Sequence, residues 1–136
     1  MSIVVGYVPT PEGRAALETA AAEAALRGVS LTVVRTQSRG HEFGAEEGER
    51  FDTDLADALR PLGDHQIDHA VRAPVGSTDP SENLIAVAEE VKAPLIVIGL
   101  RRRSKVGKLI LGSHAQRVLL DASCPVLAVK APETPW

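Results

Sequence analysis

The sequence LIVIGLRRRSKVGKLILGSHAQRVLL, residues 95–120, determines the fold that we predict for the whole chain. Its first four residues are apolar and mostly β-branched, which is typical of a strand covered on both faces. Gly99 then ends the strand, and Gly112 opens a second element. We expect that element to be a helix, with Ser113 as its N-cap and Gln116 completing a capping box. Its apolar face would comprise Ala115, Val118, Leu119 and Ala122. The stretch therefore predicts a buried strand, a basic loop and a helix.

The loop between this strand and this helix carries a concentrated positive charge. Residues 91–120 contain seven lysines and arginines and no acid, whereas the whole chain has 15 basic and 18 acidic residues and a net charge of −3. A loop that enters a helix N-terminus presents unpaired N–H groups and the positive end of the helix dipole to an anion. Because the bases gather in one island, we predict a localised anion site and no nucleic-acid partner.

Alternating signals for strands and helices surround this stretch. We predict strands at residues 3–8, 29–34, 66–72, 95–99 and 125–130. Thr10 and Asp79 each stand before a proline and an acid, as helix N-caps do, and Gly28 would end the first helix. A further helix is expected to follow the polar residues 35–50, with an end at residues 61–63 and with Phe51, Leu55, Ala58, Leu59 and Leu62 at helical spacing. The order of elements predicts an α/β fold, a single-domain doubly wound five-stranded parallel sheet with helices on both faces.

Composition agrees with one domain. The chain has 136 residues, and we assign residues 1–130 to the domain and residues 131–136 to a tail. Apolar residues make up 44% and aromatic residues 3%, so alanine and branched aliphatic residues must form the core. The single cysteine, Cys124, is expected to pack in that core and cannot form an internal disulfide. With no basic signal-peptide start and no apolar run of about 18 residues, we expect a cytoplasmic protein with no membrane partner.

Ligands of open parallel sheets bind beyond the carboxyl ends of the strands, where the winding reverses. The residues predicted at those ends include Val8, Pro9, Thr10 and Val34, together with Gly99 and the basic loop. None is an aspartate, which argues against a phospho-accepting receiver domain. A GxGxxG fingerprint and a GxxxxGK[ST] loop are both absent from the sequence, so it predicts neither a Rossmann dinucleotide site nor a Walker loop.

Two segments carry a resemblance to a known family. Gly99, Gly112 and Ser113, followed by a helix and CPVLAVK, resemble the C-terminal signature of the universal stress proteins, and VVGYVPTPEGRAALETA resembles their first strand and helix. Family members with the motif G-x2-G-x9-G-[S/T] bind ATP or related adenine nucleotides. The resemblance implies ATP or AMP as the ligand, with Mg²⁺ only as a companion of ATP. The resemblance, the strand ends, the basic loop and the start of the helix together give a predicted site made of Val8, Pro9, Thr10, Val34, Gly99, Arg101, Arg102, Arg103, Gly112, Ser113 and His114.

The chain departs from the family motif at three of these positions. Arg102 stands where the second glycine is expected, Val8 where an acid ends the first strand, and Pro9 where a small residue follows. The Arg102 side chain can close a phosphate cradle, or its guanidinium can bind the phosphate bidentately. Val8 supplies no hydrogen-bond acceptor for a nucleoside. The departures therefore affect recognition of base and sugar more than binding of the anion.

Three functions are compatible with these residues. The first is a stress-response protein that binds or senses ATP, AMP or another phosphate-bearing anion; the second is a dimeric interaction module that has lost its ligand. The third, slow ATP hydrolysis, lacks an evident water-positioning carboxylate, and no nucleophile–base pair is visible. We therefore expect a binding protein with no catalytic residues.

Histidines and edge strands complete the predictions. His65 and His69 would share one face of a strand as half of a metal site, but no third ligand accompanies them, so no metal is predicted. If residues 66–72 and 125–130 form the two edges of the sheet, the second is apolar and invites another strand. We therefore predict a homodimer centred on Val126, Leu127, Ala128 and Val129. Members of the family that the chain resembles commonly dimerise through this strand, which agrees with the predicted homodimer.

Overall fold

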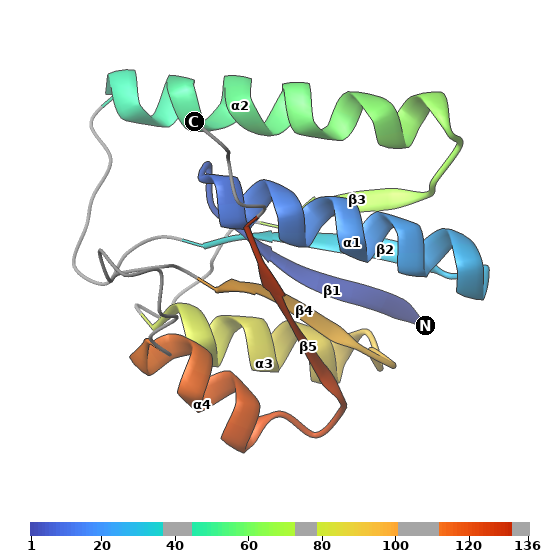
Figure 1. Ribbon diagram of the computed structural model, residues 1–136, viewed down its shortest axis with the longest axis vertical. Helices are drawn as coiled ribbons and strands as arrows, with labels where there is room; N and C mark the ends of the chain where they lie inside the picture. Colours follow the sequence, from blue (N-terminus) through green and yellow to red (C-terminus); the bar gives the residue numbers. More distant parts are fainter. Residues whose placement is uncertain (37–44, 73–78, 101–111, 132–136) are drawn as a thin grey trace.

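The computed structural model describes residues 1–36, 45–72, 79–100 and 112–131, except for the side chains of 45–48 and 51 (Figure 1). Within these residues the strands are β1 (Ser2–Tyr7), β2 (Ser30–Arg35), β3 (His69–Arg72), β4 (Ile96–Leu100) and β5 (Val126–Lys130). The helices there are α1 (Pro11–Arg27), α2 (Ala45–Asp64), α3 (Pro80–Glu90) and α4 (Ser113–Asp121). Strands and helices alternate along the chain, as the sequence predicts.

The strands form one parallel sheet in the order β3-β2-β1-β4-β5. The winding runs outward from β1 in both directions, so it reverses between β1 and β4. The predicted doubly wound five-stranded parallel fold is therefore confirmed. β3 and β5 are the two edges, as expected, and β1, β2, β4 and β5 lie within one residue of their predicted bounds at each end.

Each face of the sheet has its own core, because successive side chains of a strand point to opposite faces. Ile3, Val5 and Tyr7 of β1 pack under α1 and α2, whereas Val4 packs against α3 and α4. The two helix pairs are visible on opposite sides of the sheet in Figure 1. The first core is closed by the alanines of α1 with Leu55 and Leu62 of α2, and the second by Leu84, Ala88 and Val118. Helices on both faces are therefore confirmed.

Local capping signals agree with the structure for α1 and α3. The Thr10 hydroxyl accepts a hydrogen bond from the Gly13 N–H at 3.1 Å, and Gly28 ends α1 with φ of 66°. The Asp79 carboxylate accepts one from the Ser81 N–H at 3.0 Å. Both N-caps and the glycine C-cap were predicted correctly, because these signals act within a few residues.

The predicted start of α4 is wrong by one residue. The N-cap is Gly112 rather than Ser113, and it makes no side-chain cap hydrogen bond. The Gln116 N–H donates to the Gly112 carbonyl oxygen at 3.0 Å, so the first intrahelical bond begins at the glycine. The apolar face is also narrower than expected. Val118 is buried, whereas the Leu119 side chain is 41% exposed.

The boundary between α2 and β3 also differs from the prediction. Pro61 lies inside α2, which continues to Asp64, since buried Leu62 anchors this last part of the helix in the core. Gln66 then turns the chain with φ of 57°, so β3 is four residues long and starts at His69 instead of at residue 66. His65 consequently lies in the turn after α2, and the expectation that it shares a strand face with His69 is wrong.

Metal-ligand clusters and membrane-spanning helices are both absent from the part of the chain that the structure describes. Among those residues, no three histidine, cysteine, aspartate or glutamate side chains gather closely enough to hold a metal ion. No described helix combines the length and the apolar character that crossing a membrane requires. Cys124 is half-buried and packs on the core of the α3–α4 face, as expected, and burial raises the pKa of its thiol.

Candidate functional site

The turn that follows β1 lies at the carboxyl edge of the sheet. The Thr10 N–H donates to the Val8 carbonyl oxygen at 2.8 Å, which folds the chain tightly into α1. Val8 and Thr10 are half-buried, and Pro9 is exposed. A Cβ built on Gly13 would lie less than 3.0 Å from the Val8 carbonyl oxygen, so only glycine lets the first turn of α1 approach so closely. This turn is therefore held against the end of β1.

Gly99 reaches the same place from β4. A Cβ built on Gly99 would lie less than 3.0 Å from the carbonyl oxygen of Glu12, in the first turn of α1. The sequence motif assigns Gly99 to a phosphate cradle, but in the structure its backbone packs against α1. The glycine thus lets the end of β4 approach the first turn of α1 beside the point where the winding reverses, which is where open parallel sheets bind ligands.

Val34 of β2 is placed less favourably for contact with a ligand. Its side chain is 1% exposed and packs in the core of the α3–α4 face, so it does not line an accessible surface. The neighbouring β2 end is tied to β1, because the Thr36 N–H and hydroxyl both donate to the Tyr7 carbonyl oxygen, at 3.0 and 2.9 Å. Arg101, Arg102 and Arg103 lie outside the described residues.

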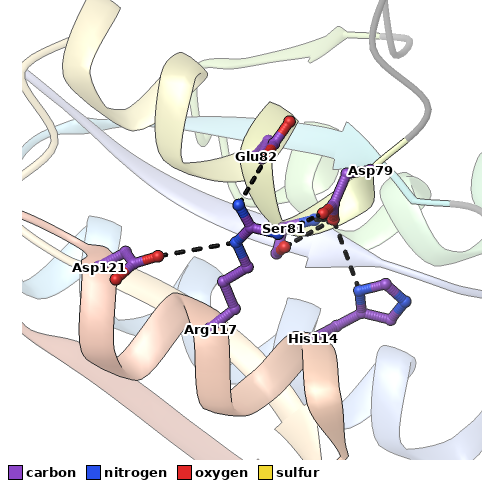
Figure 2. Close-up of polar contacts among 6 residues, drawn as sticks. All are labelled: Asp79, Ser81, Glu82, His114, Arg117 and Asp121. Atoms are coloured by element: carbon purple, nitrogen blue, oxygen red, sulfur yellow. Dashed lines mark hydrogen bonds and ion pairs between the residues drawn. The ribbon is translucent and has the colours of Figure 1, made fainter.

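The N-terminus of α4 meets the N-terminus of α3. Ser113 is exposed, and the Nδ1 atom of His114 lies 3.6 Å from an oxygen of Asp79 (Figure 2). Because the first intrahelical hydrogen bond of α4 starts at Gly112, the N–H groups of residues 113–115 have no partner inside the helix. These donors and the helix dipole make the end of α4 suitable for an anion.

Three carboxylates surround one guanidinium beside this helix end (Figure 2). Arg117 of α4 donates to Asp79 at 2.9 Å and to Glu82 at 2.7 Å, and its Nε lies 3.6 Å from Asp121. The Asp79 carboxylate also accepts a 2.6 Å hydrogen bond from the Ser81 hydroxyl. The bonds from Ser81, followed by the charge of Arg117, hold the pKa of Asp79 below its usual value.

This cluster was not predicted from the sequence, in which Asp79 is recognisable only as a helix cap and Arg117 only as one of seven bases. The spacing of Arg117 and Asp121, four residues apart on one helix, is a signal that was available. The contact between Arg117 and Asp79 was not predictable in that way, because it joins residues 38 positions apart.

A groove of about 530 Å³ lies elsewhere, between α1 and α2. Leu17, Ala21 and Leu62 are among the residues that line it, and none of the residues predicted for the site does. The residues that converge at the carboxyl edge of the sheet therefore remain the candidate site.

The architecture and the place of these residues define the chain as a doubly wound α/β protein whose candidate site lies at the switch point of its sheet. The model of the universal stress protein family matches residues 1–130, and the chain belongs to that family. A universal stress protein of Mycolicibacterium smegmatis is 42% identical over 130 residues, which cover 94% of this chain and 96% of that protein.

Solved structures agree with this family assignment. A universal stress protein from Archaeoglobus fulgidus has a TM-score of 0.80 and 34% identity, with 96% of this chain and 98% of that chain covered. A structure of the universal stress protein from A. fulgidus in complex with dAMP has a TM-score of 0.76 and 30% identity, with the same coverage. Relatives of this fold and similarity therefore include a protein that binds a nucleotide.

Proposed function

We propose that this protein binds an adenine nucleotide at the carboxyl edge of its sheet and acts as a binding or sensing protein in a stress response. The observation that carries the proposal is the dAMP complex of a relative that matches almost the whole chain in both fold and sequence. The N–H groups of residues 113–115, which have no partner inside α4, support it, because such groups suit a phosphate. In this proposal Gly112, Ser113 and His114 bind the phosphate, together with Arg101, Arg102 and Arg103 of the basic loop.

The nucleoside would lie over the turn after β1. Thr10 is half-buried there, and its hydroxyl already accepts the hydrogen bond from Gly13. Val8 offers no carboxylate, so the base and sugar receive fewer polar contacts than the phosphates. We therefore propose that phosphates contribute most of the affinity, which predicts a preference for ATP over AMP.

Isothermal titration calorimetry of the purified protein tests this proposal. We expect ATP to bind more tightly than AMP, and inorganic phosphate to bind about tenfold more weakly than AMP or worse. Binding of ATP should weaken as salt is raised, since charge interactions at an exposed site are screened. If ATP, AMP and dAMP all give no heat and no shift of the melting temperature, nucleotide binding is absent, and the alternative of a ligand-free interaction module is left.

We also propose that two copies of the chain pair through β5. This strand is an edge of the sheet, Leu127 is 36% exposed, and Val126, Ala128 and Val129 are half-buried. The Ile96 N–H donates to the Pro125 carbonyl oxygen, and Ile96 lies opposite Val126. Since main-chain groups alternate in direction along a strand, those of Val126 and Ala128 point away from β4. They are available to an antiparallel copy of β5.

Ala128→Pro is expected to weaken this dimer about a hundredfold, because proline removes an outward donor and disturbs the new ladder. The fold should persist, since the hydrogen bonds from β5 to β4 use the alternate residues. Analytical ultracentrifugation at micromolar concentration measures the effect. Val71→Pro makes the corresponding change on β3, the opposite edge, and should leave the dimer intact. A wild-type protein that sediments as a monomer would contradict the proposal.

A further inference from the structure

Arg117, in the second turn of α4, joins this helix to the first turn of α3, which is far away in the sequence. One nitrogen of its guanidinium donates to Asp79, the N-cap of α3, and a second donates to Glu82 in the first turn of α3, at 2.9 and 2.7 Å. Figure 2 shows the guanidinium lying between these two carboxylates, with His114 of α4 on the other side of Asp79. The contact is bidentate across two acids, which lysine cannot reproduce with the same geometry.

The two acids lie at an unfavourable place for an anion. His114 is the second residue of α4, and its ring lies 3.6 Å from the Asp79 carboxylate, so that carboxylate is adjacent to the helix end where a phosphate is proposed to bind. Asp79 is needed at its position because it caps α3 and accepts from both the N–H and the hydroxyl of Ser81. The first turn of α3 also favours Glu82, through the helix dipole. Both negative charges therefore serve α3, at a cost to an anion at the end of α4.

We propose that Arg117 is a positioning and charge-compensating residue for the nucleotide site. It holds the N-terminus of α4 beside that of α3, and it neutralises the Asp79 and Glu82 carboxylates so that a polyphosphate can approach. This inference rests on the proposed function. It assigns to Arg117 no direct contact with the nucleotide.

A purely structural function explains Arg117 less well. Val118, Leu84 and Ala88 already pack α4 against α3 in the core. The Arg117 side chain is 47% exposed, and ion pairs at such exposure contribute little to stability. Charge compensation differs from support of the fold in one measurable way. Loss of charge compensation should lower the affinity for each ligand in proportion to the negative charge of that ligand.

Calorimetry with ATP, AMP and adenosine on the wild type and four variants tests the inference. Arg117→Gln should weaken the binding of ATP about tenfold and that of AMP about threefold, and it should leave the binding of adenosine unchanged. Most of this effect should disappear in 0.5 M NaCl, because salt screens the charges. Arg117→Lys keeps the charge and should retain the affinity for ATP to within about threefold. The double variant Arg117→Gln with Glu82→Gln removes one of the exposed acids and should recover part of the lost affinity.

The matched control is Arg27→Gln. It removes one positive charge at the C-terminal end of α1, where Arg27 is 44% exposed and pairs with Glu23 at 3.2 Å, and it should not change any of the three affinities. Equal losses for ATP, AMP and adenosine in Arg117→Gln would overturn charge compensation. Should that variant fail to fold, the same uniform loss in Arg117→Lys would overturn it. Wild-type protein that binds none of the three ligands would remove the proposed function itself, whereas normal wild-type binding with Arg117→Gln equal to Arg27→Gln would remove this inference alone.

Discussion

Replacing Gly13 with alanine is expected to destabilise the fold by about 3 kcal/mol or more. The new Cβ would lie less than 3.0 Å from the carbonyl oxygen of Val8 and would also meet the Val8 carbonyl carbon. These are main-chain atoms, so a change of side-chain rotamer cannot relieve the clash. The Val8 carbonyl oxygen is also held by the Thr10 N–H, and the Gly13 N–H is bonded to the Thr10 hydroxyl. Relief would therefore require the whole first turn of α1 to move away from β1.

Urea denaturation measures this effect against a matched control. Gly63→Ala makes the same chemical change inside α2, where a Cβ would meet nothing within 4 Å. It should stabilise the protein by about 0.5–1 kcal/mol, because alanine has the higher helix propensity and lowers the entropy of the unfolded chain. If Gly13→Ala proved as stable as the wild type, the first turn of α1 would not be pressed against Val8 as the structure has it.

The fold could be predicted in most of its parts because its signals are local. Thr10 and Gly28 determine the two ends of α1 through hydrogen bonds to residues only a few positions away. The central strands are apolar on both faces, so each is recognisable in the sequence as a continuous apolar run. The polar alternation of residues 66–72 is also typical of an edge strand, and β3 is an edge of the sheet. These features depend on secondary structure alone, so no knowledge of distant contacts was needed.

The errors in the predicted helix boundaries arose where two structural signals in the sequence compete. Pro61 is a local reason to end a helix, but Leu62 anchors the next turn in the core, and the tertiary contact prevails. The same extension places His65 in the turn after α2, so it cannot share a strand face with His69. At α4, Ser113 has the better side chain for a cap, yet the backbone of Gly112 occupies that position and Ser113 becomes the first helical residue. Which of two adjacent residues becomes the N-cap depends on the path of the chain before the helix. The spacing of residues in the sequence does not encode that path.

The candidate site was predictable only as a set of motif positions. The motif includes Gly99, but it does not reveal that Gly99 approaches Glu12 of α1. Asp79 and Arg117 come from different helices, and only the fold brings them together. A motif therefore names the backbone positions that a phosphate can approach, whereas the charges around them have to be found in the structure.

Gly112→Val is expected to weaken ATP binding at least about a hundredfold while leaving the fold in place. Gly112 has φ of −69° and ψ of 165°, an extended conformation that any residue adopts easily, so its backbone does not require glycine. Under the proposed function, a glycine at this N-cap serves the close approach of the phosphate to the main chain. A branched Cβ would stand between the phosphate and the first N–H groups of α4.

Gly112→Ala is the matched variant for this experiment. Alanine and valine are similarly poor N-caps, so both changes should lower the free energy of unfolding by a similar amount, at most about 1 kcal/mol. Their affinities for ATP should differ, since the single methyl group of alanine obstructs the phosphate less than the two methyl groups of valine, which branch from its Cβ. Calorimetry and thermal melting of the two variants separate obstruction from loss of the cap. Unchanged affinity in both would place the nucleotide away from the N-terminus of α4, because no phosphate in contact with that main chain could tolerate the valine.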